Sequence, residues 1–587
     1  MKRIIIAASV VTAVAAGGYW VSQQPNNGFT NSYDVLAYVP ANTVLFSGQL
    51  EPFPIRSYLN SVADTYKNTS DEMIEEFYSA SEYDPEDKRM KFFISLTKSY
   101  MDSMESADKF IATMGVAEQM RGYVYTLGMV PVLKLEVAKP EAIWALLDKA
   151  ELDSGLSHEQ RQLKELTYRA YTLSEPDDEE TVELVFAQQN NFLTVTFNTS
   201  LNETALLETA FGLSPVEESL ASTNMIEDII KTHSFSDNSI GYINHQAIVN
   251  ALTAPNESLL GKQIAKLLAK QNDKSLQVLQ TPACQTELPA IAANWPRTVF
   301  GMNSLSITDS ESTFDMSMVV ESHNNAILSA LKQLTGFIPS YVKDIDNTVF
   351  AMGIGLDVAQ VSPAINAIWN DLQQPSYQCE PLQQMQQSIS QQNPAMLGMI
   401  ASMANGVKGL GFSVLDYSLD ETKTEPALKD LDALVSLSAD DPRALFNMLA
   451  TFKPELAQIK LPENNTVVAL SSLMPLPLVP GVNAKLLITD DHMIIFTGDK
   501  AEKTAQNLSK VPLVNNGIYN LSLDYSKAFT PIVSMAEMSG QVLPDEVAAF
   551  KDYDVRLNTG LGINEQGIVV HSYINAKAAP TAIADAK

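Results

Sequence analysis

A serine and a lysine that could form a nucleophilic pair stand one helical turn apart in the first hundred residues. Ser95-Leu96-Thr97-Lys98 fits the Ser-x-x-Lys pattern, in which the lysine takes the proton of the serine hydroxyl and activates it for attack. Ser236-Asp237-Asn238 follows downstream as a second motif of the same chemistry. Ser95 and Lys98 are therefore the candidates for a periplasmic hydrolase whose site is not contiguous in sequence.

The rest of that catalytic pattern is missing from the sequence. Serine β-lactamases and penicillin-binding proteins add Lys-Thr-Gly, which does not follow here, and Ser236-Asp237-Asn238 precedes a strand as an ordinary turn. The chain also lacks Gly-x-Ser-x-Gly, His-Glu-x-x-His, a phosphate loop and a dinucleotide fingerprint. Its six histidines do not cluster with a nucleophile in sequence, although the fold could bring them together. The sequence therefore favours a protein that is not an enzyme, with a hydrolase kept as the alternative, and it assigns no cofactor and no metal ligand to the site.

Methionines recur at helical spacing in two segments, about 70–120 and about 380–406, which we expect to be helical insertions. A methionine face is apolar and adaptable, because the side chain is unbranched and polarizable. Three roles remain open: packing in a core, a lid over a groove for a lipid tail or an unfolded peptide, and thioether ligation of Cu(I). The methionines that a binding face would use are Met101, Met104, Met396, Met399 and Met403.

The composition predicts a folded, acidic protein and excludes a nucleic-acid binder. The 587 residues include 39 Lys and Arg against 69 Asp and Glu, which gives a formal net charge of -30. Binding to a phosphate backbone needs an excess of basic residues on some face, and no long basic run exists here. Because 45% of the residues are apolar, the chain has ample material for a buried core.

The amino terminus predicts export from the cytoplasm. Met1-Lys2-Arg3 precedes an uncharged apolar run, residues 4–21, that is long enough to span a membrane and ends in Tyr19-Trp20, as at an interfacial aromatic belt. Ala13-Val14-Ala15 offers a small-residue cleavage site instead. A cleaved signal peptide and a retained inner-membrane anchor both stay open. In either case we expect a periplasmic body that meets the membrane only through this segment.

The two cysteines are expected to form one disulfide. Cys284 and Cys379 both lie in polar segments that contain proline, and an oxidising compartment favours pairing of an even number of thiols. Two unpaired, buried thiols are the alternative.

Four short sequence segments recur in the same order in the two halves of the chain, which predicts an internal duplication. Each consists of a strand or hairpin with its neighbouring turn or helix start. The pairs are Asn42-Thr43-Val44-Leu45-Phe46 with Asn347-Thr348-Val349-Phe350-Ala351, residues 133–147 with residues 435–449, the turn Asn190-Asn191 with Asp490-Asp491, and residues 305–309 with residues 561–565.

The local patterns predict an α+β fold for both copies. β-branched and aromatic runs flank Asn190-Asn191, a pair that tolerates a tight hairpin turn. Pro140 and Pro442 suit the first turn of a helix that follows a strand. We expect two sandwich-like copies with mixed or antiparallel sheets and helices on one face. The expected divisions are a leader at 1–29, copies at 30–322 and 338–577, and a disordered tail at 578–587.

The segment Tyr38-Val39-Pro40-Ala41-Asn42-Thr43-Val44-Leu45-Phe46 resembles the opening strand of a bacterial family of secreted or membrane-anchored proteins of unknown function. In that family a Pro-Ala-Asp/Asn-Thr segment precedes the first strand, and strand-helix units repeat. The second copy matches through Asn347-Thr348-Val349 but has Asp344-Ile345-Asp346 in place of the Pro-Ala lead. The resemblance implies a bacterial envelope protein and carries no activity.

These observations predict an exported envelope protein that binds or scaffolds rather than catalyses. The duplicated sheets and the methionine-bearing helices would form a cradle for a protein or lipid-like partner. A periplasmic hydrolase and a purely structural spacer are the alternatives.

Overall fold

The computed structural model describes most of the chain. The described residues are 34–62, 86–175, 178, 180–200, 202, 204–214, 216–270, 274–392, 398, 401–402, 404–420, 428–452, 456–473, 482–538 and 554–577. The apolar segment 4–21, the tail 578–587 and Met396, Met399 and Met403 lie outside them. No helix within the described ranges combines the length and the apolar character needed to cross a membrane.

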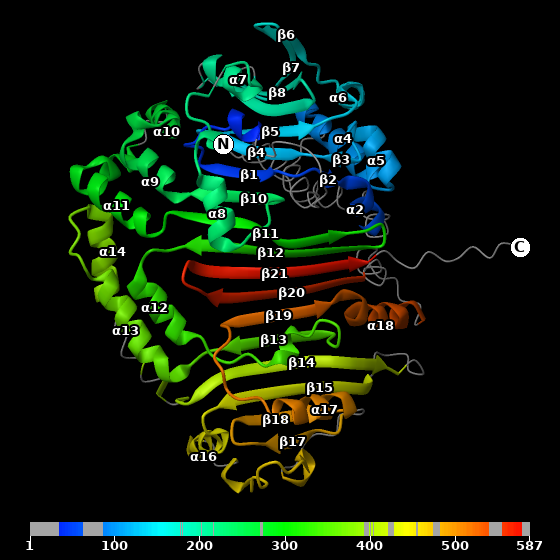
Figure 1. The fold of residues 1–587 in the computed structure, drawn as a ribbon, viewed down its shortest axis with the longest axis vertical. Helices are drawn as coiled ribbons and strands as arrows, with labels where there is room; N and C mark the ends of the chain where they lie inside the picture. Colours follow the sequence, from blue (N-terminus) through cyan, green and yellow to red (C-terminus); the bar gives the residue numbers. More distant parts are fainter. Residues whose placement is uncertain are drawn as a thin grey trace, which may run out of the picture. The chain divides into compact units, whose positions relative to one another are not determined.

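The chain forms two compact units. Unit 1 comprises residues 1–321, 379–381 and 577–587, and unit 2 comprises residues 322–378 and 382–576. Each unit contains a large sheet whose strands run side by side in Figure 1.

The sheet of unit 1 is antiparallel in every described pairing. Asn190, at φ 53, makes the tight turn between its two most buried strands, as the Asn-Asn pair predicts. The strands in spatial order are β12 (Glu311–Glu321), β11 (Arg297–Ile307), β10 (Ser239–Asn244), β1 (Leu45–Gln49), β4 (Gly122–Leu127), β5 (Val130–Glu136), β9 (Phe192–Thr199), β8 (Val182–Gln189), β7 (Leu166–Thr172) and β6 (Glu159–Leu163). A separate pair joins β2 (Phe53–Pro54) to β3 (Gln119–Met120).

Helices cover both faces of this sheet, not one face as expected. On one face α4 (Lys88–Ser103) and α6 (Pro140–Ser154) supply Phe92 and Leu147 to a core that includes Leu184 of β8. On the other face α7 (Thr204–Phe211) packs Phe211 against Val185. The reason is that β8 is buried at consecutive positions, which is typical of a strand packed on both sides. The remaining α-helices of unit 1 are α2 (Ile55–Val62), α5 (Ala107–Met114), α8 (Met225–His233), α9 (His245–Thr253), α10 (Leu259–Lys270) and α11 (Pro282–Asn294).

Cys284 and Cys379 form the expected disulfide within unit 1. Both residues are fully buried, and the backbone N–H of Cys379 donates to Glu287 Oε2 at 2.9 Å. Titration of the denatured, unreduced protein with a thiol reagent should therefore find no free thiol. Two reactive thiols per chain would contradict the bridge.

The sheet of unit 2 is also antiparallel in its described pairings. Its strands in spatial order are β20 (Asp554–Ile563), β19 (Tyr519–Asp524), β13 (Phe350–Gly355), β14 (Val407–Leu419), β15 (Leu428–Ala439), β18 (His492–Thr497), β17 (Lys485–Ile488) and β16 (Val468–Ala469). β21 (Gly567–Lys577) follows β20 through a tight hairpin. The α-helices are α12 (Asn325–Leu334), α13 (Val361–Leu372), α14 (Glu380–Ser390), α16 (Pro442–Phe452), α17 (Asp499–Leu508) and α18 (Tyr525–Met538).

The buried face of the central strands of unit 2 carries small residues, because a segment of backbone lies directly on it. A Cβ atom at Gly409 would overlap the carbonyl oxygen of Phe337, and one at Gly411 would overlap the hydroxyl of Tyr341. That hydroxyl bonds Ser436 Oγ at 2.8 Å. Glycine at these positions therefore permits a close approach that a larger side chain would prevent.

The expected α+β class is confirmed by these sheets and helices. Pro140 and Pro442 each open a helix that follows a strand, as their sequence context predicts.

Candidate functional site

The Ser-x-x-Lys pattern is not realised as a serine–lysine hydrogen bond. Ser95 is buried on α4, and its hydroxyl donates to Asp153 Oδ2 of α6 at 2.6 Å. This hydrogen bond lowers the pKa of Asp153. Lys98 is exposed on the same helix. Ser95 therefore joins two helices of the unit 1 core, and its proton is held by a carboxylate that is already a stable acceptor.

A buried serine and histidine do meet in unit 2. Ser438 Oγ lies 2.9 Å from His492 Nδ1, and His492 Nε2 lies 3.1 Å from the carbonyl oxygen of Val511. A carbonyl acceptor at Nε2 favours a proton there, which leaves Nδ1 to accept from the serine. Burial lowers the pKa of His492. Both side chains are fully buried, so a substrate has no access to this pair.

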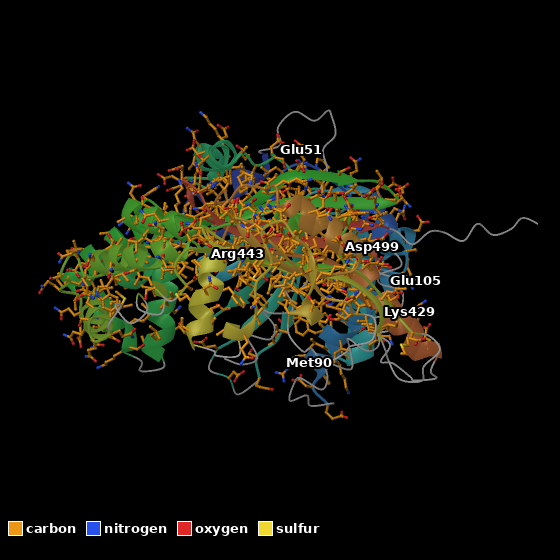
Figure 2. The ribbon with its side chains drawn as sticks, turned by 90° about the horizontal axis from the view of Figure 1, so that it is seen from below. Glu51, Met90, Glu105, Lys429, Arg443 and Asp499 are labelled. Atoms are coloured by element: carbon orange, nitrogen blue, oxygen red, sulfur yellow. A yellow bond between two sulfur atoms is a disulfide. The ribbon has the colours of Figure 1, made fainter. Side chains whose placement is uncertain are left out.

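Neither a metal nor a catalytic cluster emerges elsewhere in the described part of the chain. Within those residues no group of three His, Cys, Asp or Glu side chains is placed to hold a metal ion. Near the end of α4, Met104 is buried and Met101 is half-buried. Met90, which is labelled in Figure 2, lies at the start of that helix and is also half-buried. These side chains therefore take part in packing.

A pocket of about 360 Å³ lies in unit 1 beside the ends of β1, β4 and β10. Its lining includes Asn42, Asn244 and Gln246, with Glu257 as the one carboxylate among the described lining residues. The hydroxyls of Ser258 and Thr126 also line it, but each accepts a backbone N–H, from Gly261 and Leu45 respectively. No histidine or lysine is among the described lining residues, so nothing there is placed to activate a hydroxyl.

The most unusual surface is one face of the unit 2 sheet, which we name the apolar face. Two rows of side chains run across β19, β13, β14, β15 and β18, and within each row the residues on neighbouring strands are directly paired. Directly paired residues in an antiparallel sheet point to the same side, so both rows belong to one face. Its members are Leu521, Met352, Phe412, Val435 and Ile495 in one row, and Tyr519, Ile354, Leu410, Leu437 and Met493 in the next.

The apolar face is open to solvent and uncharged. Half of its members are between 36% and 48% exposed, and the others are half-buried. None of the ten positions holds a charged residue. Five strands at about 4.8 Å spacing make this face roughly 20 Å wide. A contiguous exposed apolar surface is typical of a site where another molecule binds.

Helix α18 borders the apolar face at one end of its strands. The hydroxyl of Tyr417, on the same side of β14, donates to the carbonyl oxygen of Ala528 at 2.5 Å. In Figure 1, α18 lies beside the ends of β19 and β20. The helix exposes a further apolar residue, Ile532.

Comparisons of this chain with known protein families, with curated proteins and with solved structures found no match.

Sequence reasoning missed the apolar face because alternation in a strand does not show which side is buried. Alternation is visible in Phe350-Ala351-Met352-Gly353-Ile354-Gly355, and the usual interpretation buries phenylalanine, methionine and isoleucine. In the structure the alanine and the glycines face inward instead. Glycine or serine at every second position in three neighbouring strands was the available signal.

Proposed function

We propose that this protein is a non-enzymatic binding protein of the bacterial cell envelope, and that the apolar face docks an apolar surface of its partner. The observation that carries the proposal is the pair of uncharged, solvent-exposed rows across five strands of unit 2. Removing such a surface from water is favourable by about 25 cal/mol per Å².

The export signal supports the envelope location. Lys2 and Arg3 precede the apolar run 4–21, which would deliver the chain to the periplasm and, if retained, tether it to the inner membrane. The resemblance of residues 38–46 to an envelope family agrees with this location, and the disulfide suits an oxidising compartment.

We also propose that the two units descend from one duplicated module. The strand order β11-β10-β1-β4-β5-β9-β8-β7 in unit 1 has a counterpart in β20-β19-β13-β14-β15-β18-β17-β16 in unit 2. Val137 N donates to Asn191 O in unit 1, and Ala439 N donates to Asp491 O in unit 2. On this proposal one copy kept its sheet face covered by helices, and the other exposed it for binding.

An apolar dye tests the docking role. The full chain should enhance the fluorescence of anilinonaphthalene sulfonate, and Leu410→Asp and Val435→Asp should each reduce that enhancement several-fold, because a carboxylate keeps the surface hydrated. Val514→Asp is the matched control, since Val514 is exposed outside the sheet of the same unit.

Urea midpoints close to that of the wild type would show that the variants fold. Equal dye fluorescence from the wild type and from both folded face variants would overturn the docking role.

A further inference from the structure

We propose that the partner's contribution to the apolar face is a cationic amphipathic helix that resembles helix α4 of this chain. The inference rests on the proposed docking role and adds the class of ligand. Unit 1 supplies its basis, because the corresponding strands there are covered by helices of the same chain.

The central strands of the two units are arranged in the same order, and residues at equivalent positions lie opposite each other. In unit 1, Leu133 of β5 lies opposite Val195 of β9, and in unit 2, Val435 of β15 lies opposite Ile495 of β18. β5 and β9 are third and fourth in the run β1-β4-β5-β9, and β15 and β18 are third and fourth in the run β13-β14-β15-β18. Val195 is 8% exposed, whereas Ile495 is 39% exposed.

Helix α4 accounts for much of this difference. Phe92, Phe93 and Leu96 of α4 belong to the same apolar cluster as Leu133 and Val195. In unit 2, α16 packs against β15 and β18, yet Val435 stays 46% exposed. Among the described residues of unit 2, no helix buries the apolar face as α4 and α6 bury their side of unit 1.

The composition of α4 defines the expected ligand. Its sixteen residues, KRMKFFISLTKSYMDS, contain four basic residues and one acidic residue. Phe92 and Phe93 are buried, while Lys88 and Lys98 are exposed on the solvent side. A chain with a net charge of -30 attracts a cationic helix at long range, and the uncharged apolar face then receives its aromatic side.

The dimensions favour a helix over an acyl chain. A sixteen-residue helix is about 24 Å long and about 10 Å across, which suits an open surface roughly 20 Å wide. Small apolar ligands are usually held in concave sites that bury most of their surface. The ten side chains of the apolar face instead form two straight rows that suit the i, i+3 and i+4 contacts of a helix laid flat.

A peptide that copies residues 88–103 tests the inference. The labelled peptide should bind the full chain saturably in fluorescence anisotropy, with micromolar affinity. Val435→Asp and Leu410→Asp should each weaken binding at least tenfold, whereas Val514→Asp should leave it unchanged. In the peptide, Phe92→Asp should abolish binding, because the aromatic side makes the contact.

Other results separate the proposals. Failure of the peptide to bind, or equal binding by folded Val435→Asp and wild type, would overturn the helix as ligand. If the helix is excluded in this way but dye binding still depends on Val435, the docking role stands and only the helix is rejected as its ligand. Two further outcomes apply if the peptide does not bind. If the chain binds phosphatidylglycerol vesicles and Val435→Asp abolishes that binding, the occupant is a lipid surface. If the chain self-associates and Val435→Asp abolishes the association, the occupant is a second copy.

Discussion

Replacing Lys134 with methionine is expected to stabilise the protein at pH 7 by on the order of 3 kcal/mol. Lys134 lies on β5 in unit 1 and is 5% exposed. Its ammonium donates to Thr194 Oγ1 at 2.7 Å, and among the described residues no carboxylate pairs with it. Burial therefore lowers its pKa to about 7. At pH 7, where about half of the folded chains have lost the proton, this lowering of the pKa costs the wild type about 4 kcal/mol, and losing the bond to Thr194 offsets about 1 kcal/mol of the gain.

The pH dependence identifies the charge as the cause. Below about pH 7 both the folded and the unfolded chain hold the proton, so the advantage of Lys134→Met is constant there. Between about pH 7 and pH 10.4 only the unfolded chain holds it, so the wild type gains about 1.4 kcal/mol per pH unit relative to the variant. An advantage of about 3 kcal/mol at pH 7 should therefore vanish near about pH 9, and above that pH the wild type should be the more stable form.

Urea unfolding at pH 6, 7, 8 and 9 measures this effect. Lys429→Met is the matched control, because Lys429 is an exposed strand lysine, and its midpoint should change little at any pH. A stabilisation by Lys134→Met that is the same at pH 6 and pH 9 would contradict the charge explanation.

Gly409→Ala is expected to destabilise the protein by about 3 kcal/mol or more, although it adds one methyl group. Phe337 N donates to the carbonyl of Lys408 at 2.8 Å, so the chain around Phe337 is held against β14 by a backbone hydrogen bond. The new Cβ would overlap the carbonyl oxygen of Phe337, and backbone cannot rotate away as a side chain can. Either the hydrogen bond or the strand geometry must give way.

Gly562→Ala, on β20 of the same unit, provides the control for glycine itself. Nothing lies within 4 Å of a Cβ atom at Gly562. Its urea midpoint should change little or rise slightly, since alanine restricts the unfolded chain. Similar midpoints for both variants would mean that the close approach at Gly409 contributes little to stability.

Tertiary contacts, which spacing along the sequence does not specify, determined which candidate residues meet. Ser95 and Lys98 are one helical turn apart, yet the partner of Ser95 is Asp153, from a helix that follows several strands later. Ser438 and His492 are far apart in sequence and meet across neighbouring strands in a buried place. Spacing along one helix predicts which residues can meet, but tertiary packing decides which do and whether water reaches them.

The sequence by itself determined the local elements. The Asn190-Asn191 hairpin, the helices that begin at Pro140 and Pro442, and the α+β class follow from turn chemistry and from the fixed backbone angle of proline. The two cysteines were paired correctly because the chain offers only one pairing.

Only the tertiary structure decided which side of the unit 2 sheet is buried. Strand alternation separates Met352 and Ile354 from Ala351 and Gly353, but it does not say what covers each side. The backbone around Phe337 lies close against the glycine-rich side, so the large apolar side chains remain in solvent. The segment 336–342, which comes shortly before β13 in the sequence, packs across β13 and β14 and buries this side, because close packing of backbone on backbone excludes every larger side chain.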